Sequence, residues 1–167
     1  MNVSVSANQV LVVEYRDDLR SEFERLNREW IEQFFSVEEA DKTVFADPRA
    51  TVLLPGGQIF FVLEDGKAKG TCAVLQESEK TFELAKMAVT GSARGRGFGD
   101  LLMQAAIEFA KHAGAEALVL SSNSKLVPAI RLYEKYGFHR VPMISDERYK
   151  RVDIMMRLDL RRQEHGQ

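Results

Sequence analysis

The chain contains the stretch Arg94-Gly95-Arg96-Gly97-Phe98-Gly99, which lies between a strand-like run and a pattern typical of an amphipathic helix. A helix N-terminus offers free N–H groups and a partial positive charge, and both suit phosphate oxygens. Glycines let the backbone approach an anion closely, and arginines add charge-assisted hydrogen bonds. We call residues 94–99 the glycine loop and predict that it binds phosphate; a plain helix-capping loop is the alternative.

Two common nucleotide-binding motifs fit the glycine loop poorly. A dinucleotide fold needs a third glycine where Asp100 stands, and an acidic residue about 20 positions later, where Val119 and Leu120 stand. A mononucleotide P-loop needs Gly-Lys followed by Ser or Thr, and the sequence has none. A protein that binds the phosphates of a nucleotide therefore stays only as a third hypothesis, behind two others that the rest of the sequence supports.

The residues before the glycine loop predict an antiparallel meander. Short runs of branched and aromatic residues at 58–63, 68–75 and 81–89 are typical of strands. The dipeptide Asp65-Gly66 is a strong signal for a tight hairpin between the first two. A further strand is expected at residues 10–15.

Helices are expected on either side of this meander. Residues 19–34 have apolar side chains at helical spacing, with Asp17 and Asp18 as candidate N-caps. Ser36 and Glu39 form a capping-box pattern for a second helix, which should stop near Asp47-Pro48. Two further helices are expected, one from the glycine loop to about residue 113 and one at 128–135. The last three strands are expected at 117–120, 138–141 and 154–160.

Length and composition indicate one globular domain over residues 1–167, with flexible tails at 1–8 and 161–167. The net charge of −2 provides no broad basic field for nucleic acid or an anionic membrane. Cys72 is the only cysteine, so an internal disulfide is excluded. The N-terminus lacks a signal pattern, and no apolar run approaches the roughly 20 residues of a membrane helix, so we expect a cytoplasmic protein.

Two motifs resemble those of the GNAT acetyltransferase superfamily. The spacing Arg94-x-x-Gly97-x-Gly99 is similar to its pyrophosphate-binding signature, and residues 83–89 resemble its fourth strand. Asn123 and residues 129–138 resemble its second motif. The resemblance implies an α/β (strictly α+β) fold: a mixed, mostly antiparallel sheet of six or seven strands, helices on both faces, and central strands that splay apart.

The resemblance also implies how acetyl-CoA binds. In GNAT enzymes the pantetheine arm lies in the gap between the splayed strands, and a backbone amide of the fourth strand polarises the thioester oxygen. Asn123 would bond a pantetheine amide, with a simple turn asparagine as the alternative. The implied acetyl-CoA-binding residues are Met87, Ala88, Val89, Arg94, Gly95, Arg96, Gly97, Phe98, Gly99, Asp100, Asn123 and Ala129.

Two residues are candidates for proton transfer. Tyr133 matches the general acid of the family, and a neutral phenol can donate a proton to a leaving thiolate. The alternative is a core tyrosine. Glu83 is a carboxylate in an otherwise apolar strand and is the candidate base, acting through water. The alternative is a surface or salt-bridged glutamate, with Lys86 as one candidate partner.

Other residues have weaker functional patterns. Trp30, Phe34 and Phe35 are candidates for the acceptor pocket, although core packing is favoured for Phe34. The charged segment 142–153 joins the last two strands and is expected to be a solvated loop; the alternative is that it borders the acceptor site. Cys72 is expected to be a buried structural thiol. His112, His139 and His165 form no ligand pattern, so no metal is predicted.

The sequence therefore predicts an acyl-CoA-dependent N-acyltransferase. It would move acetyl from acetyl-CoA to the primary amine of a small molecule or protein, by direct attack in a ternary complex. The alternative is a catalytically silent acyl-CoA-binding module used for regulation. Dimers are common in the family, so a homodimer stays open.

Overall fold

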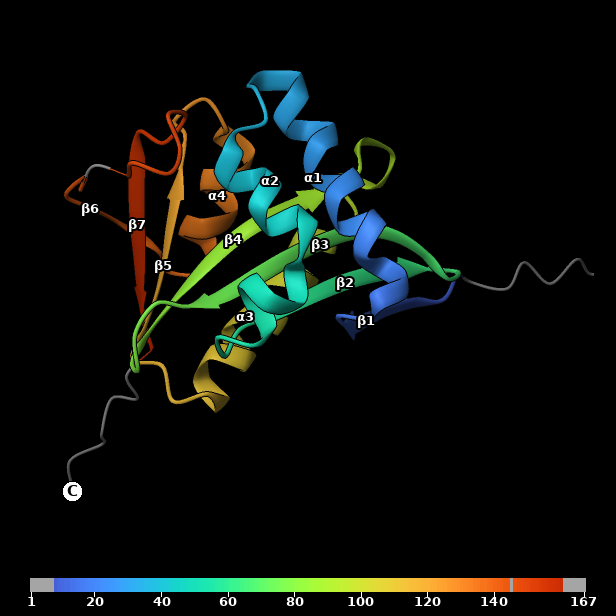
Figure 1. Cartoon of the computed structure of the whole chain (residues 1–167), viewed down its shortest axis with the longest axis horizontal. Helices are drawn as coiled ribbons and strands as arrows, with labels where there is room; N and C mark the ends of the chain where they lie inside the picture. Colours follow the sequence, from blue (N-terminus) through green and yellow to red (C-terminus); the bar gives the residue numbers. More distant parts are fainter. Residues whose placement is uncertain (1–7, 145, 161–167) are drawn as a thin grey trace, which may run out of the picture.

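One mixed sheet with the strand order β1-β2-β3-β4-β5-β7-β6 forms the centre of the protein (Figure 1). The computed structural model describes residues 8–144 and 146–160, so the tails predicted at the two ends lie outside it except for Asn8. The strands are β1 (Val10–Glu14), β2 (Gln58–Glu64), β3 (Lys67–Gln76), β4 (Thr81–Val89), β5 (Ala117–Ser122), β6 (His139–Val141) and β7 (Ile154–Asp159). The helices are α1 (Arg20–Phe34), α2 (Glu39–Ala46), α3 (Phe98–His112) and α4 (Val127–Lys135).

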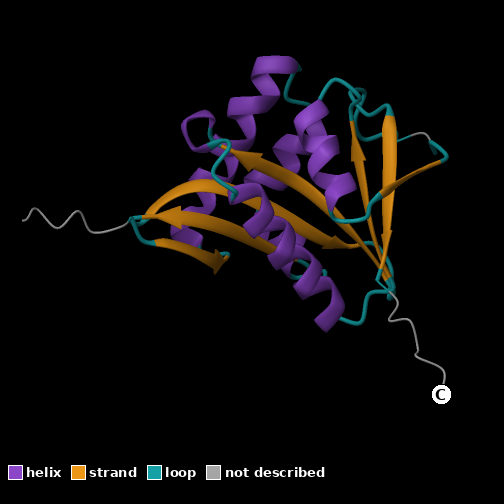
Figure 2. Cartoon of the chain, turned by 180° about the vertical axis from the view of Figure 1, so that it is seen from behind, coloured by secondary structure: helices purple, strands orange, loops and turns teal. Residues whose placement is uncertain are grey.

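The sheet confirms the predicted fold class. Within the described residues seven strands pair, and every pair is antiparallel except β4 with β5. Helices cover both faces (Figures 1 and 2). The Asp65-Gly66 hairpin between β2 and β3 is present as expected, because Asp65 and Gly66 both have the positive φ angles that such a turn requires.

Two apolar cores lie on opposite faces of the sheet, and β2 shows why. Successive side chains of a strand point to opposite faces. Phe60 and Val62 pack in the core that includes α3, whereas Ile59, Phe61 and Leu63 pack in the core that includes α1. Both faces of the central strands are therefore buried, which explains their nearly continuous apolar sequence.

The strands β4 and β5 separate soon after they start, as the splayed arrangement requires. They are paired only from Thr81–Ala117 to Glu83–Val119. In Figure 1 both strands begin near the same point and then fan apart. Beyond Glu83, β4 has no partner strand on that side, so its backbone groups there are open to a ligand.

A β-bulge in β4 accompanies this separation. The pairing with β3 passes from Thr71–Ala88 to Ala73–Ala85, so β4 carries one extra residue in this interval. Lys86 lies in the interval and has a φ angle of 54°, which is uncommon for a residue with a side chain. A bulge bends a strand and increases its twist. It therefore directs the second half of β4 away from β5.

Two predictions of helix starts were wrong. Asp17 and Asp18 belong to a short 3-10 turn (Asp17–Leu19) and do not cap α1. The capping box of α2 is formed by Glu38 and Asp41 rather than by Ser36 and Glu39. The Asp41 carboxylate accepts a hydrogen bond of 2.9 Å from the Glu38 amide, because α2 starts two residues later than the Ser36 pattern implied. A π-helical turn at Arg49–Leu53 was not predicted.

Asp41 is also the centre of a buried ion cluster. Its side chain is fully buried and binds Lys86 of β4 and Arg151 of the segment before β7, the latter at 2.7 Å. Burial alone would raise the pKa of Asp41, but the hydrogen bond from Arg151 and the charge of Lys86 lower it to about 2. One carboxylate therefore joins α2, β4 and the chain that leads into β7.

Replacing Asp41 with Asn should lower the free energy of unfolding at pH 7 by about 3–5 kcal/mol, because two cations lose their buried partner. Urea denaturation measures this change. The matched control is Asp17→Asn, which breaks the exposed Asp17–Arg49 pair and should cost less than about 1 kcal/mol. Similar losses in both variants would contradict the assigned role of Asp41.

The same cluster predicts a pH dependence. The pKa of Asp41 falls from 3.8 to about 2 on folding, so its contribution is complete above the higher value and disappears as the pH drops through the lower one. The stability difference between wild type and Asp41→Asn should therefore shrink between about pH 4 and pH 2. A difference that stays constant over this range would show that the carboxylate charge does not matter.

Helix length bears on membrane insertion. In the part of the chain that the structure describes, no helix combines the length and apolar character that crossing a bilayer requires.

Candidate active site

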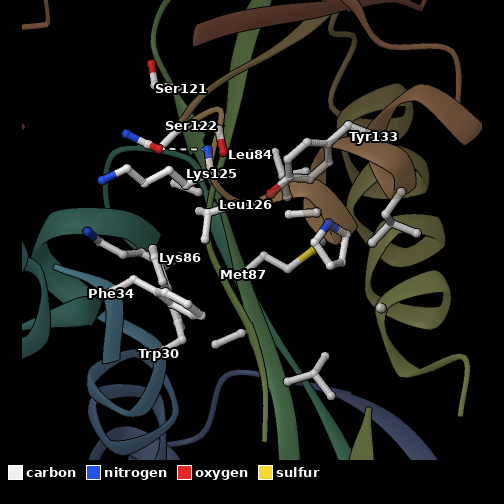
Figure 3. A pocket seen from close by; sticks show the side chains of 18 of the residues that line it. Trp30, Phe34, Leu84, Lys86, Met87, Ser121, Ser122, Lys125, Leu126 and Tyr133 are labelled. Atoms are coloured by element: carbon white, nitrogen blue, oxygen red, sulfur yellow. Dashed lines mark hydrogen bonds between the residues drawn. The ribbon is translucent and has the colours of Figure 1, made fainter. Parts of the chain in front are cut away.

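A cavity of about 480 Å³ opens where β4 and β5 separate. The end of α1 contributes Trp30, Phe34 and Phe35; β4 contributes residues 83–89; the glycine loop and the start of α3 contribute residues 93–95 and 97–100; β5 and the turn after it contribute residues 121–123, 125 and 126; α4 contributes Pro128, Ala129, Leu132 and Tyr133; the segment before β7 contributes Arg148, Tyr149, Arg151 and Val152. Residues from six parts of the chain therefore meet at one site. Figure 3 shows side chains of α1, β4, β5 and α4 around it.

The glycine loop has the geometry of an anion-binding loop. Gly95 and Gly97 have φ angles of 77° and 81°, and an added Cβ at either would meet no protein atom within 4 Å. Gly97 is the N-cap of α3, and the first intrahelical bond runs from the Leu101 amide to the Gly97 carbonyl at 3.2 Å. The N–H groups before Leu101 have no partner inside the helix, so they can bind an anion that enters the open space above the glycines.

The two arginines of the loop differ in position. Arg94 is exposed, lines the cavity and can reach an anion there. Arg96 does not line the cavity: it forms an ion pair with Glu64 of β2, with one N–O distance of 2.9 Å, and stacks on Phe98. The hydrogen bond from Arg96 lowers the pKa of Glu64 to about 2. Arg96 thus anchors the loop to the sheet.

Further contacts fix the loop and the start of α3. The Glu29 carboxylate accepts hydrogen bonds from the Gly91 amide at 2.9 Å and from the Thr90 hydroxyl. Asp100 lines the cavity but is bound by Lys135 at 2.6 Å and by the Tyr136 hydroxyl. The hydrogen bond from Lys135 lowers the pKa of Asp100. These contacts tie the anion-binding segment to α1 and α4.

Tyr133 and Ala129 lie on the cavity face of α4, as predicted from their spacing of one helical turn. Figure 3 shows the Tyr133 hydroxyl directed into the cavity. Among the described residues this hydroxyl has no hydrogen-bond partner, and burial raises its pKa to about 12. A phenol with such a pKa stays protonated at neutral pH and can donate a proton.

Met87, Ala88 and Val89 line the cavity from β4, whereas Tyr133 lines it from α4. Their strand is unpaired towards β5, so backbone donors and acceptors of this segment face the space between the strands. An amide in this position can donate to an oxygen atom that gains negative charge.

Asn123 lines the cavity but uses its side chain within the protein. Its amide donates to the Arg151 carbonyl at 2.7 Å, and its carbonyl oxygen accepts from the Lys125 amide at 2.9 Å. This is the arrangement of a turn asparagine, the alternative considered from the sequence.

Glu83 is buried and forms an ion pair of 2.9 Å with Arg148. A salt-bridged glutamate was the alternative considered from the sequence, and the partner is Arg148 rather than Lys86, because Lys86 binds Asp41 instead. Desolvation and the neighbouring Glu83 carboxylate raise the pKa of Glu77 to about 7. Glu77 can therefore hold a proton near neutral pH.

Two expectations, one about Phe34 and one about the segment 142–153, were wrong. Phe34 does not pack in the core: it is 49% exposed and lines the cavity with Trp30 and Phe35. The segment 142–153 is more than a solvated loop, since Arg148, Tyr149, Arg151 and Val152 all line the cavity. Sequence reasoning missed Tyr149, and the only signal was an aromatic residue among charged ones.

Cys72 matches its predicted role. It is fully buried, and desolvation raises the pKa of its thiol to about 12, so it is not a nucleophile at neutral pH. A search of the described residues finds no group of three or more His, Cys, Asp or Glu side chains arranged to hold a metal ion.

The family model described as "Acetyltransferase (GNAT) family" matches residues 17–138, which include β4, the glycine loop and α4. The chain belongs to the GNAT acetyltransferase family.

Relatives of known name agree with this assignment. N-acetylaspartate synthetase of Danio rerio is 35% identical over 106 residues, which are 62% of this chain and 38% of that enzyme. The chain therefore matches well under half the length of that relative. An uncharacterised N-acetyltransferase of Schizosaccharomyces pombe is 30% identical over 82% of this chain and 83% of its own length.

Solved structures show the same fold. A GNAT acetyltransferase of Staphylococcus aureus has a TM-score of 0.84 at 17% identity, over 92% of this chain and all of the other. The yncA acetyltransferase of Salmonella typhimurium, solved with its cofactor acetyl-CoA, has a TM-score of 0.73 at 18% identity, over 95% of this chain and 98% of the other.

The glycine loop predicts a ligand effect on stability. Acetyl-CoA should raise the melting temperature, because a ligand that binds only the folded state stabilises it. Gly97→Val should abolish this increase, since the new side chain would project into the open space where phosphate approaches. Differential scanning fluorimetry with and without acetyl-CoA measures the shift.

The matched control is Gly66→Val. Gly66 has the same φ angle of 81° and the same open surroundings, but it lies in the β2–β3 hairpin, outside the cavity. Both variants should lose similar stability from backbone strain, and only Gly97→Val should lose the shift. An intact shift in Gly97→Val would exclude the glycine loop from coenzyme binding.

Proposed function

We propose that the protein is an N-acetyltransferase that transfers acetyl from acetyl-CoA to a primary amine by direct attack. The observation that carries the proposal is that one cavity brings together an anion-binding loop, unpaired β4 backbone and the free Tyr133 hydroxyl. The acetyl-CoA bound to the Salmonella typhimurium relative supports the same ligand here.

The cavity fits the parts of acetyl-CoA. The helix N-terminus and Arg94 suit the pyrophosphate, and the space above Gly95 and Gly97 admits it. The unpaired β4 residues 87–89 suit the amides of the pantetheine arm. The coenzyme supplies the activated acetyl group as a thioester.

Each residue then has a distinct role. The amine nitrogen attacks the acetyl carbon, so it must lose one proton, and the departing thiolate must gain one. Tyr133 donates to the thiolate, since its hydroxyl is directed into the cavity and carries its proton at neutral pH. Glu83 accepts the amine proton through water, and an amide of residues 87–89 stabilises the carbonyl oxygen.

One observation favours the alternative of a silent acyl-CoA-binding module. Glu83 already forms an ion pair of 2.9 Å with Arg148, so its carboxylate is engaged within the protein. An acceptor screen that follows thiol release from acetyl-CoA separates the two. The panel should contain amino acids, polyamines and peptides, since several relatives are named for N-acetylaspartate synthesis.

Tyr133→Phe should reduce kcat by about 10²–10⁴-fold while changing acetyl-CoA affinity little. The lost proton donor acts only in the transition state, whereas the ring still packs beside Phe138. The measurements are kcat, KM for acetyl-CoA and the melting temperature. Tyr15→Phe, outside the cavity, is the control and should retain full activity. A kcat loss below about threefold with chemistry rate-limiting would remove Tyr133 from the mechanism.

Glu83→Gln should reduce activity most at low pH. The amine is largely protonated there and most needs a base, whereas at high pH it attacks unaided. The glutamine can still accept a hydrogen bond from Arg148, so the local structure should persist. The ratio of wild-type to variant kcat/KM should fall as the pH rises from about 6 to about 9. The control is Glu79→Gln in the exposed β3–β4 turn, and a ratio independent of pH would assign the proton to another group.

A further inference from the structure

We propose that the acceptor amine carries a carboxylate next to it, as an α-amino acid does, and that Arg148 binds this carboxylate with Lys86 and Tyr149 beside it. The inference rests on the proposed acetyltransferase function and specifies its acceptor. The inference derives from the charges and the unused hydrogen-bond donors of Lys86, Arg148, Tyr149 and Arg151, which form the cationic wall of the cavity.

The wall presents three cations to the cavity and keeps most, but not all, of their counter-ions behind it. Lys86, Arg148 and Arg151 all line the cavity. Of their partners, Asp41 and Asp146 do not line it, and their side chains are only 0% and 5% exposed. Glu83, which also pairs with Arg148, lines the cavity and is 7% exposed. A ligand on this wall therefore meets positive charge first, which favours an anionic group.

The same residues keep donors that no described residue accepts. Arg148 binds Asp146 through Nε and Nη2 and Glu83 through Nη2, which leaves Nη1 without a partner among the described residues. The Tyr149 hydroxyl accepts from Lys86 at 2.9 Å, so its own proton stays available. Carboxylate oxygens are acceptors only and match such a set of donors.

Arg148 is placed to reach a ligand without losing its present contacts. Its side chain is 49% exposed, whereas its partner Glu83 is 7% exposed. Arg148, Lys86 and Tyr149 also line a second cavity of about 320 Å³ on the side of α2. These residues thus form a partition between two cavities, where an anion would be surrounded by donors.

The Glu83–Arg148 ion pair matches both ends of an α-amino acid. The two side chains are 2.9 Å apart, and in an α-amino acid the amine and the carboxylate are attached to one carbon. A carboxylate on Arg148 therefore places the amine beside Glu83, the candidate base. Lys86 and Glu83 belong to the same strand as Met87, so the proposed acceptor site and the segment assigned to the acetyl group are both on β4.

The test compares α-amino acids with their α-amides, which keep the amine and side chain but lack the carboxylate. With saturating acetyl-CoA, the wild-type protein should acetylate at least one amino acid with a kcat/KM about 10- to 100-fold above that of its amide. Arg148→Gln should remove this preference by lowering kcat/KM for the amino acid about 10-fold or more beyond any change for the amide. Arg140→Gln, on exposed β6, is the matched control and should keep the preference.

The outcomes separate the proposals. An equal loss for acid and amide in Arg148→Gln would mean that Arg148 only positions Glu83, which overturns carboxylate recognition. Faster turnover of amides, polyamines or peptides would overturn it too, while the acetyltransferase function would stand. Binding of acetyl-CoA without transfer to any amine would overturn both.

A second measurement uses only the wild-type enzyme, so it tests the inference even if Arg148→Gln does not fold. Propionate, a carboxylate without an amine, should inhibit the wild-type enzyme competitively against the acceptor, and propionamide should not. Equal inhibition by the two, or none by propionate, would contradict the inference.

Discussion

The separation of β4 from β5 is the constraint on which the rest of the structure depends. Backbone N–H and C=O groups need partners, and two adjacent strands normally supply them to each other. Here the pairing stops at Glu83–Val119, and the bulge at Lys86 directs β4 away. The protein therefore keeps a segment of unpaired backbone inside its core, and the glycine loop, α4 and the cationic wall are arranged around it. Electrostatics stabilise this open arrangement, because Asp41 joins α2 to the bulge and to the segment before β7.

The sequence was a good guide where local chemistry determines the structure. Residues 81–89 were predicted as a strand with the bounds that β4 has, and Asp65-Gly66 located the hairpin. The glycine loop was recognisable because positive φ angles and a helix start are local properties. Tyr133 could be assigned to the cavity because the family resemblance aligned α4, which periodicity alone would not have achieved.

The remainder depends on contacts between residues far apart in the sequence. Arg151 meets Asp41 across 110 residues, and Arg148 meets Glu83 across 65, so no local pattern indicates either pair. Arg96 looked like a phosphate ligand because of its neighbours, but Glu64, 32 residues away, determines its direction. Phe34 was expected in the core because its type favours burial, whereas its position at the end of α1 places it at the cavity.

The anchoring of the glycine loop has a consequence for the kinetics of ligand capture. Arg96 fixes the loop to β2, Glu29 fixes the turn before it, and Lys135 fixes the first turn of α3. The conformational entropy of this segment is therefore lost when the chain folds, and little more is lost when an anion arrives. A loop that is already ordered can capture its ligand at a rate close to that of productive encounters, with no slow rearrangement step before binding.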